Sequence, residues 1–133
     1  MDGLHLTADL HGCPPAHAAM IDIEALRTHC LAAVAGAGLQ AVGELFHRFP
    51  PLAGAPAGAA QGITGVVLLA ESHLAVHTWP ELGAVTLDVY VCNFGADNTV
   101  AAHALLDRLL AGFDAQRVER HALRRGQPPD VAA

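Results

Sequence analysis

The side chains most capable of chemistry lie close together, in the stretch TGVVLLAESHLAVHTWPELGAVTLDVYVCN over residues 64–93. Ser72 stands between Glu71 and His73, and a second histidine, His77, follows His73 by four residues. A serine hydroxyl becomes a strong nucleophile only when a base or a strained backbone assists it. Serine, histidine and an acid are the groups of a triad hydrolase, but the G-x-S-x-G elbow found in many hydrolases is absent.

Two histidines and a cysteine of the same stretch allow a second hypothesis, a metal site. His73 and His77 would lie on one face of a strand, because side chains alternate between the two faces. Cys92 could then add a thiolate ligand to a zinc ion. Histidines held by backbone groups or exposed to solvent explain the pattern with fewer assumptions, so we expect no metal.

Alternating apolar and polar residues surround these groups and predict β-strands. In AVTLDVYVC, residues 84–92, every second residue is valine or leucine, as in a half-buried strand. Apolar residues at three-to-four spacing predict two amphipathic helices, the second capped by Asn98. The whole pattern predicts strands over 4–10, 39–49, 65–70, 74–79, 84–92 and 116–123, and helices over 22–37 and 98–111.

The order of these elements, β-α-β-β-β-β-α-β, predicts the fold class. Short connections between consecutive strands favour antiparallel pairing, so the expected fold is α+β: a two-layer α/β sandwich in which two helices cover one face of an antiparallel sheet. The 133 residues suit a single domain. Because 53% of the residues are hydrophobic, we expect a second copy to bury the other sheet face in a homodimer.

Composition excludes several kinds of partner. The formal net charge of -6 argues against a nucleic-acid surface. No apolar run approaches the roughly 20 residues of a membrane span, and the N-terminus does not resemble a signal peptide. Three cysteines without a C-x-x-C pair argue against a disulfide framework. We therefore expect a cytoplasmic protein that binds neither membrane nor nucleic acid.

Two segments lack the side chains that pack a core. Residues 52–61, LAGAPAGAAQ, are a low-complexity run of alanine, glycine and proline, which predicts a mobile loop. The polar tail RRGQPPDVAA, residues 124–133, is predicted to fray.

The central stretch as a whole resembles the processing and active-site segment of the small prokaryotic S-adenosylmethionine decarboxylase proenzymes. Those proenzymes carry a pattern like E-S-H-x-x-x-H-T-W-P-E, then an aspartate, then a cysteine. Here ESHLAVHTWPE at residues 71–81 is followed by Asp88 and Cys92. The similarity also includes HLTADLHGC at 5–13, FHRFP at 46–50 and TGV at 64–66, and it covers residues 4 to about 125.

The resemblance implies an S-adenosylmethionine decarboxylase-like domain that cuts itself between Glu71 and Ser72. The products would be a β chain, residues 1–71, and an α chain, residues 72–133. A pyruvoyl group made from Ser72 would then stand at the new N-terminus. This self-generated group is the family's cofactor, and its ketone forms a Schiff base with the substrate amine.

Three further positions match residues that act in processing or catalysis. His77 matches the proton acceptor of processing, and Thr64 stands where the family usually has a serine that assists it. A hydroxyl that stabilises the tetrahedral intermediate survives this exchange. Cys92 matches the proton donor of decarboxylation; without the resemblance it reads as an inert buried thiol.

The substrate side of the resemblance involves Phe49, Trp79 and Glu81. Phe49 and Trp79 match aromatics that line a nucleoside pocket, where stacking and cation–π attraction suit an adenine beside a sulfonium. Glu81 matches a carboxylate that accepts the ribose hydroxyls. On residue type alone, both aromatics are better explained as core residues.

The activity implied is that of a lyase, a zymogen until cleaved, which converts S-adenosylmethionine to CO2 and the aminopropyl donor of spermidine biosynthesis. The partners implied are S-adenosylmethionine and a second cleaved protomer in a homodimer. Residues 52–61 look like an insertion beside Phe49 and Thr64, and Val91-Cys92-Asn93 departs from the family pattern on the substrate side. Two alternatives therefore stay open: the same chemistry on ornithine or arginine, and a non-catalytic homologue that binds a nucleoside.

Overall fold

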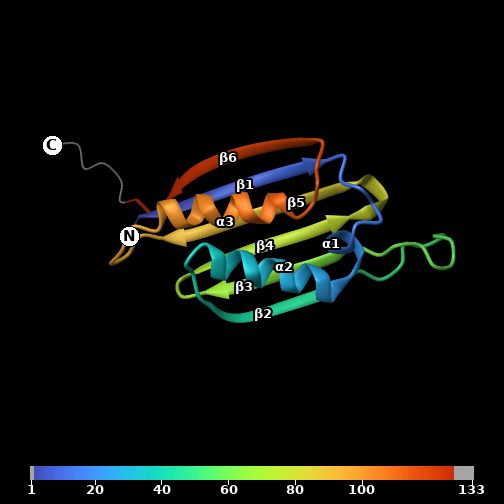
Figure 1. Ribbon diagram of the computed structural model, residues 1–133, viewed down its shortest axis with the longest axis horizontal. Helices are drawn as coiled ribbons and strands as arrows, with labels where there is room; N and C mark the ends of the chain where they lie inside the picture. The colour runs from blue at the N-terminus through green and yellow to red at the C-terminus, as the bar shows by residue number, and fades with distance from the viewer. Residues whose placement is uncertain (1, 128–133) are drawn as a thin grey trace.

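Six antiparallel strands form one sheet in the computed structural model, which describes residues 2–127, and their order is β2-β3-β4-β5-β1-β6 (Figure 1). The strands are β1 (Gly3–His11), β2 (Ala41–Arg48), β3 (Ile63–Leu69), β4 (Ser72–Trp79), β5 (Ala84–Cys92) and β6 (Arg117–Arg125). The helices are α1 (Ala18–Ile21), α2 (Ile23–Gly36) and α3 (Thr99–Ala111), with a short 3-10 turn, η1 (Pro80–Leu82). The predicted order is confirmed, with α1 as an addition.

The helices α2 and α3 lie over one face of the sheet (Figure 1). Helix α2 packs on β2 and β3, and α3 packs on β5 and β1. Between the two layers lies the core, which includes Leu6, Leu10, Leu26, Leu74, Val76, Val89, Leu105 and Phe113. The predicted two-layer α+β fold is confirmed. The alternation of apolar and polar residues indicated it because each strand buries one side against the helices and leaves the other side open. None of the helices within residues 2–127 is long and apolar enough to cross a membrane.

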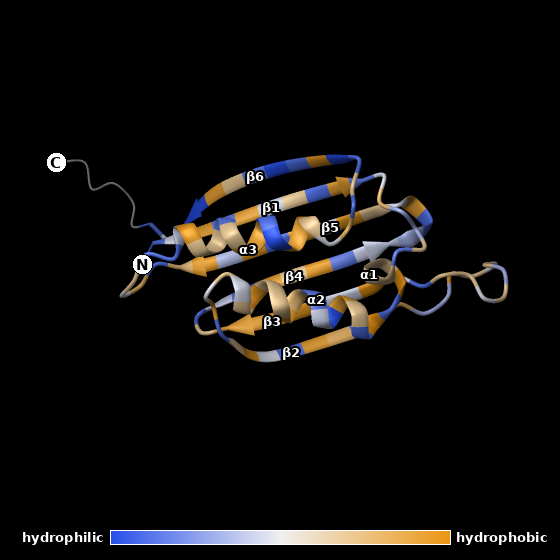
Figure 2. Ribbon diagram, in the orientation of Figure 1, coloured by the Kyte–Doolittle hydropathy of each residue, from blue (hydrophilic) through white to orange (hydrophobic). Residues whose placement is uncertain are grey.

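The opposite face of the sheet, called the open face below, carries the other half of each strand's alternation. Thr64, His77 and Asp88 lie on it, and none of the helices within residues 2–127 covers it. Large apolar side chains also lie there, among them Leu45 and Leu68, which are 70% and 50% exposed. Figure 2 shows that β3 is mostly hydrophobic, whereas the edge strand β6 is mostly hydrophilic. Burial of this face by a second copy stays a prediction.

The structure corrects the predicted ends of two strands. Ser72 and His73 do not form the turn; they begin β4, because they pair with β3 and β5. Strand β6 continues to Arg125, beyond the predicted end at 123, because it pairs with β1 along its whole length. The last six residues of the tail predicted to fray, 128–133, lie outside the described residues.

The N-terminal cap of α3 also differs from the prediction. The Asn98 side chain does not cap the helix. Instead, Asp97 Oδ1 accepts a hydrogen bond from the backbone N–H of Thr99 at 2.9 Å. Hydrogen bonding to the Thr99 side chain, with a smaller contribution from this backbone N–H, lowers the pKa of Asp97. The Asn98 amide is therefore available for a different contact, with the end of β5.

Residues 52–61 form two successive hydrogen-bonded turns. The N–H of Ala55 donates to Leu52 O at 3.0 Å, and the N–H of Ala59 donates to Pro56 O at 3.1 Å. The third residue of each turn is a glycine, Gly54 and Gly58, with φ of 81° and 80°. A type II turn requires this positive φ at its third position, where glycine has no Cβ to clash. The repeated Ala-Gly pair thus has a conformational reason.

Candidate active site

The residues predicted to form the site lie in two groups at opposite ends of β4. Glu71 and Ser72 are at its start, beside the end of β5, where Cys92 lies. His77 and Trp79 are near its end, with Thr64 opposite on β3. Figure 1 shows that these two ends are at opposite edges of the molecule along the strand direction. We call them the serine end and the aromatic end.

At the serine end, the chain is strained just before the serine. Glu71 adopts a left-handed conformation with φ of 61°, which costs a residue with a Cβ about 1–3 kcal/mol. It does so because β3 and β4 are joined by only two residues, Ala70 and Glu71. Ser72 therefore directly follows a residue whose strained backbone can assist a serine nucleophile.

The Ser72 hydroxyl is held by the neighbouring strand. The backbone N–H of Cys92 donates to Ser72 Oγ at 3.2 Å. Cys92 is buried, and its carbonyl accepts a hydrogen bond from the Asn98 amide at 2.9 Å. The backbone N–H of Asn98 in turn donates to Asn93 Oδ1 at 2.8 Å. Asn98 thus fixes the end of β5 beside Ser72, a role that its sequence position before a helix did not reveal.

The other two cysteines lie in the core. Burial, with a smaller contribution from Glu44, raises the pKa of the Cys30 thiol to about 12. Burial also raises the pKa of Cys13. Both therefore remain protonated at neutral pH, and Cys92 is the cysteine that lies next to Ser72.

At the aromatic end, Thr64 and His77 are direct cross-strand partners on β3 and β4. Thr64 Oγ1 lies 3.1 Å from His77 Nδ1, which is hydrogen-bond distance. Both side chains are partly buried on the open face. The structure therefore joins the two residues that the resemblance assigned to processing.

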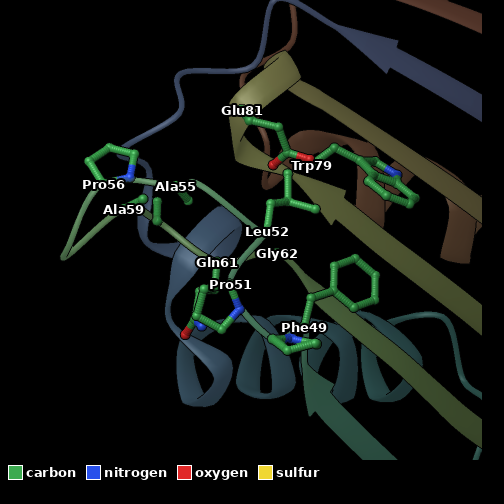
Figure 3. Close-up of a pocket in the computed structure, with 12 residues that line it drawn as sticks. Phe49, Pro51, Leu52, Ala55, Pro56, Ala59, Gln61, Gly62, Trp79 and Glu81 are labelled. Carbon is green, nitrogen blue, oxygen red and sulfur yellow. The ribbon is translucent and has the colours of Figure 1, made fainter.

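An apolar pocket of about 470 Å³ lies beside this pair (Figure 3). Its wall includes Phe49 and Trp79, whose ring centroids are 5.3 Å apart, and Glu81. Phe49 reaches it because its N–H donates to Gly62 O at 2.8 Å, which closes the base of the loop between β2 and β3. The remaining wall comes from that loop: Pro50, Pro51, Leu52, Ala55, Pro56, Ala59, Ala60, Gln61 and Gly62.

A polar cluster on the open face lies between the two ends. Asp88 Oδ1 is 3.7 Å from His5 Nε2 and 3.6 Å from His73 Nε2. The rings of both histidines lie edge-on or tilted against Tyr90. The sequence prediction did not include Asp88 among the site residues and gave His73 no catalytic role. His5 joins them because the alternation of β1 places its side chain on the open face.

The hydrolase and zinc hypotheses both lose their geometric basis. His77 is five residues along β4 from Ser72, about 16 Å away, and its side chain points to the other face. His73 and His77 are about 13 Å apart along the strand, and Cys92 is at the serine end. Within residues 2–127, no group of three or more His, Cys, Asp or Glu side chains could hold a metal ion.

Ser72 directly follows a residue in the left-handed conformation and begins a central strand of a two-layer α+β fold. This arrangement suits the class of pyruvoyl-dependent decarboxylases. Ser72 suits the role of pyruvoyl precursor, since its Oγ accepts a backbone hydrogen bond and the residue before it, Glu71, is strained. Residues 4–126 match the S-adenosylmethionine decarboxylase family. The chain belongs to that family, which confirms the resemblance seen in its motifs.

Individual relatives agree over nearly the full chain. An S-adenosylmethionine decarboxylase proenzyme of Aquifex aeolicus (strain VF5) is 36% identical over 125 residues, 93% of this chain and 81% of the relative. One from Moorella thermoacetica is 34% identical over 132 residues, 98% of this chain and 94% of the relative. The crystal structure of the adenosylmethionine decarboxylase from Aquifex aeolicus VF5 superposes with a TM-score of 0.79 at 30% identity, covering 98% of this chain and 96% of that one.

Proposed function

We propose that this chain is a self-processing S-adenosylmethionine decarboxylase. It cuts its own backbone between Glu71 and Ser72, and it then releases CO2 from S-adenosylmethionine to give the aminopropyl donor for spermidine. The observation that carries the proposal is the strained Glu71, with φ of 61°, directly before a serine whose Oγ is held by the Cys92 N–H. Family membership supports the same activity.

The cut at Glu71–Ser72 uses only groups of the chain and one water. Ser72 Oγ attacks the Glu71 carbonyl carbon and the C–N bond breaks, so that the amide becomes an ester and the Ser72 nitrogen becomes an amine. Removal of the Ser72 α-proton then breaks the Cβ–O bond and expels the Glu71 carboxylate. Water replaces the nitrogen of the resulting dehydroalanine, ammonia leaves, and a pyruvoyl group remains. Relief of the strain at Glu71 favours the first step.

Once formed, the pyruvoyl group supplies an electron sink for the decarboxylation of a bound amino acid. The role of Cys92 is to donate a proton to the α-carbon of the substrate. Its place beside Ser72 supports this role, because a general acid must lie within reach of the reacting carbon. In the uncut chain the Cys92 backbone N–H donates to Ser72 Oγ, the oxygen that later leaves with Glu71, and this bond places the two residues side by side before the cut.

The active unit is a homodimer of cleaved protomers. Within one chain His77 cannot reach Ser72, since about 16 Å of β4 separates them. A twofold axis perpendicular to the strands, with open face packed on open face, would place the aromatic end of one copy at the serine end of the other. Leu45 and Leu68, both exposed on that face, support such packing.

The aromatic pocket would hold the nucleoside part of the substrate. Phe49 and Trp79 offer stacking surface, and Glu81 offers acceptors for the ribose hydroxyls. The pocket volume, about 470 Å³, lies in the range of small-molecule sites. We also infer a cytoplasmic location, since all three cysteines are free, as expected in a reducing compartment.

Denaturing mass spectrometry tests the cleavage directly. Purified protein is expected as two pieces, residues 1–71 and 72–133, whereas Ser72→Ala should stay one chain of 13.8 kDa. Release of labelled CO2 is then compared for S-adenosylmethionine, ornithine and arginine. An uncut wild-type chain without activity would instead indicate a non-catalytic nucleoside-binding homologue, and release from ornithine or arginine alone would reassign the substrate.

A further inference from the structure

The two aromatic rings of the pocket touch each other. Their centroids are 5.3 Å apart, and their planes make an angle of 43°. A flat base held between two parallel rings needs them about 7 Å apart, two contacts of about 3.5 Å. In this geometry a base stacks on the outside of the Phe49–Trp79 pair, and its second face is free to contact another element that lines the pocket.

The turns of residues 52–59 form the wall that lies across from these rings. Leu52, Ala55, Pro56 and Ala59 line the same pocket as Phe49 and Trp79. In Figure 3, the Leu52 side chain lies between the loop and the two aromatic residues. The positive φ of Gly54 and Gly58 folds the segment into the two turns that hold these apolar side chains at the pocket.

The Leu52 side chain adds nothing to the hydrophobic core. It is 69% exposed and does not belong to the core. Exposing a large apolar side chain gives up the stabilisation that its burial would bring. An apolar ligand in the pocket would cover it and recover this contribution, and the base of a nucleoside is such a ligand.

We propose that residues 52–59 are the second wall of the nucleoside pocket. Leu52 and the alanines of the two turns cover the face of the base that does not stack on the aromatic pair. The wall makes the site selective for substrates that carry a base over simple amino acids such as ornithine. This inference rests on the proposed function, and it adds a specificity-determining element to the aromatic pair and Glu81.

Trp79 provides a direct measure of binding, because it is the single tryptophan of the chain. The probe is 5′-methylthioadenosine, a nucleoside without the amino acid, titrated into cleaved wild-type protein while tryptophan fluorescence is followed. Leu52→Ala is expected to weaken this binding roughly tenfold, because it removes three carbon atoms from the contact. The KM for S-adenosylmethionine should rise by a similar factor with kcat and chain cleavage unchanged.

Leu82→Ala is the matched control. The exposed fraction of Leu82, 72%, is similar to that of Leu52, but Leu82 does not line the pocket. Its truncation should leave the affinity for 5′-methylthioadenosine unchanged. Both leucines are exposed, so both variants should fold.

A second comparison tests the turns rather than Leu52. Gly54→Ala and Gly58→Ala force a Cβ onto positive φ and should disturb the wall, whereas Gly38→Ala imposes the same strain far from the pocket. Weaker nucleoside binding is expected for the first two variants only.

The outcomes separate the two levels of inference. If wild-type protein binds 5′-methylthioadenosine and Leu52→Ala binds it equally well, the wall is overturned while the proposed function stands. If active wild-type protein gives no fluorescence response to saturating 5′-methylthioadenosine, the aromatic pocket itself is wrong, and the wall with it.

Discussion

Thr64 and His77 face each other across β3 and β4, with Thr64 Oγ1 3.1 Å from His77 Nδ1. The contact orients the imidazole ring through Nδ1, so that Nε2 remains for contact with another group. It also explains why threonine can replace serine at this position: the hydroxyl is retained, and the extra methyl group fits a half-buried site. The pair lies about 16 Å from the Ser72 of its own chain.

Removal of the Thr64 hydroxyl should slow processing. Thr64→Val keeps the shape of the side chain but cannot bond to His77 or to the tetrahedral intermediate, and loss of one such donor typically costs about 10²-fold in rate. Thr64→Ser is the control and should cleave at the wild-type rate. The measurement is a time course of intact and cut chain in freshly purified precursor; equal rates for the valine and serine variants would contradict the role.

Mixed dimers should reveal whether the site is shared between two copies. Neither Ser72→Ala nor His77→Ala is expected to cleave alone. In a co-expressed mixture, however, the His77→Ala chain retains its serine and meets the intact His77 of its Ser72→Ala partner. Mass spectrometry should then find cut His77→Ala chains, distinguished by a tag on each variant. If the mixture stays as uncut as the two separate variants, the shared site is wrong.

Cys92→Ala should separate processing from decarboxylation. The bond to Ser72 Oγ comes from the backbone N–H of residue 92, which alanine retains, so the chain should still be cut. Loss of a general acid should lower kcat by about 10²–10⁴-fold. Chain composition and CO2 release are measured on the same sample. An uncut Cys92→Ala chain would show that the thiol acts already in processing.

The left-handed conformation of Glu71 predicts a gain in stability from Glu71→Gly. Glycine adopts φ of 61° without a Cβ clash, so in a Ser72→Ala background the free energy of unfolding should rise by about 1 kcal/mol. With Ser72 present, cleavage should slow severalfold, because less strain is released. Urea titration and the cleavage time course measure the two effects.

Asp114→Gly is the control for this prediction. Asp114 also has positive φ, 53°, but it lies between α3 and β6, away from the cut. The substitution should stabilise the fold without changing the cleavage rate. If both glycine variants slow cleavage equally, strain at Glu71 has no special role.

Thr78 should be important for stability rather than for chemistry. It is fully buried, its Oγ1 accepts from the Ile63 N–H at 2.9 Å, and it donates to Met20 O at 2.9 Å. Thr78→Val leaves both backbone groups without this partner and should destabilise the protein by about 1–3 kcal/mol. Thr78→Ser keeps both bonds and should lose less. Urea unfolding in the Ser72→Ala background measures the difference; equal midpoints would contradict the prediction.

Local pattern was sufficient for much of the fold. The alternation in residues 84–92 predicted β5 with its bounds, and the spacing of apolar residues predicted α2 and α3 within a few residues. These elements follow from sequence because each buries one side against the same core, so that the period of the pattern reports the local geometry. The family also followed from sequence alone, through the long motif at residues 71–81.

Contacts between distant segments depended on the tertiary structure. The sequence places Ser72 and His77 five residues apart, but an extended strand separates them by about 16 Å and points them to opposite faces. Asn98 reads as a helix cap, yet its amide bonds to the Cys92 carbonyl because α3 begins beside the end of β5. The loop 52–61 reads as a linker, but its two turns form a wall of the pocket of Phe49 and Trp79. The residue types therefore determined which chemistry is possible, whereas strand register and loop closure decided which of those residues meet.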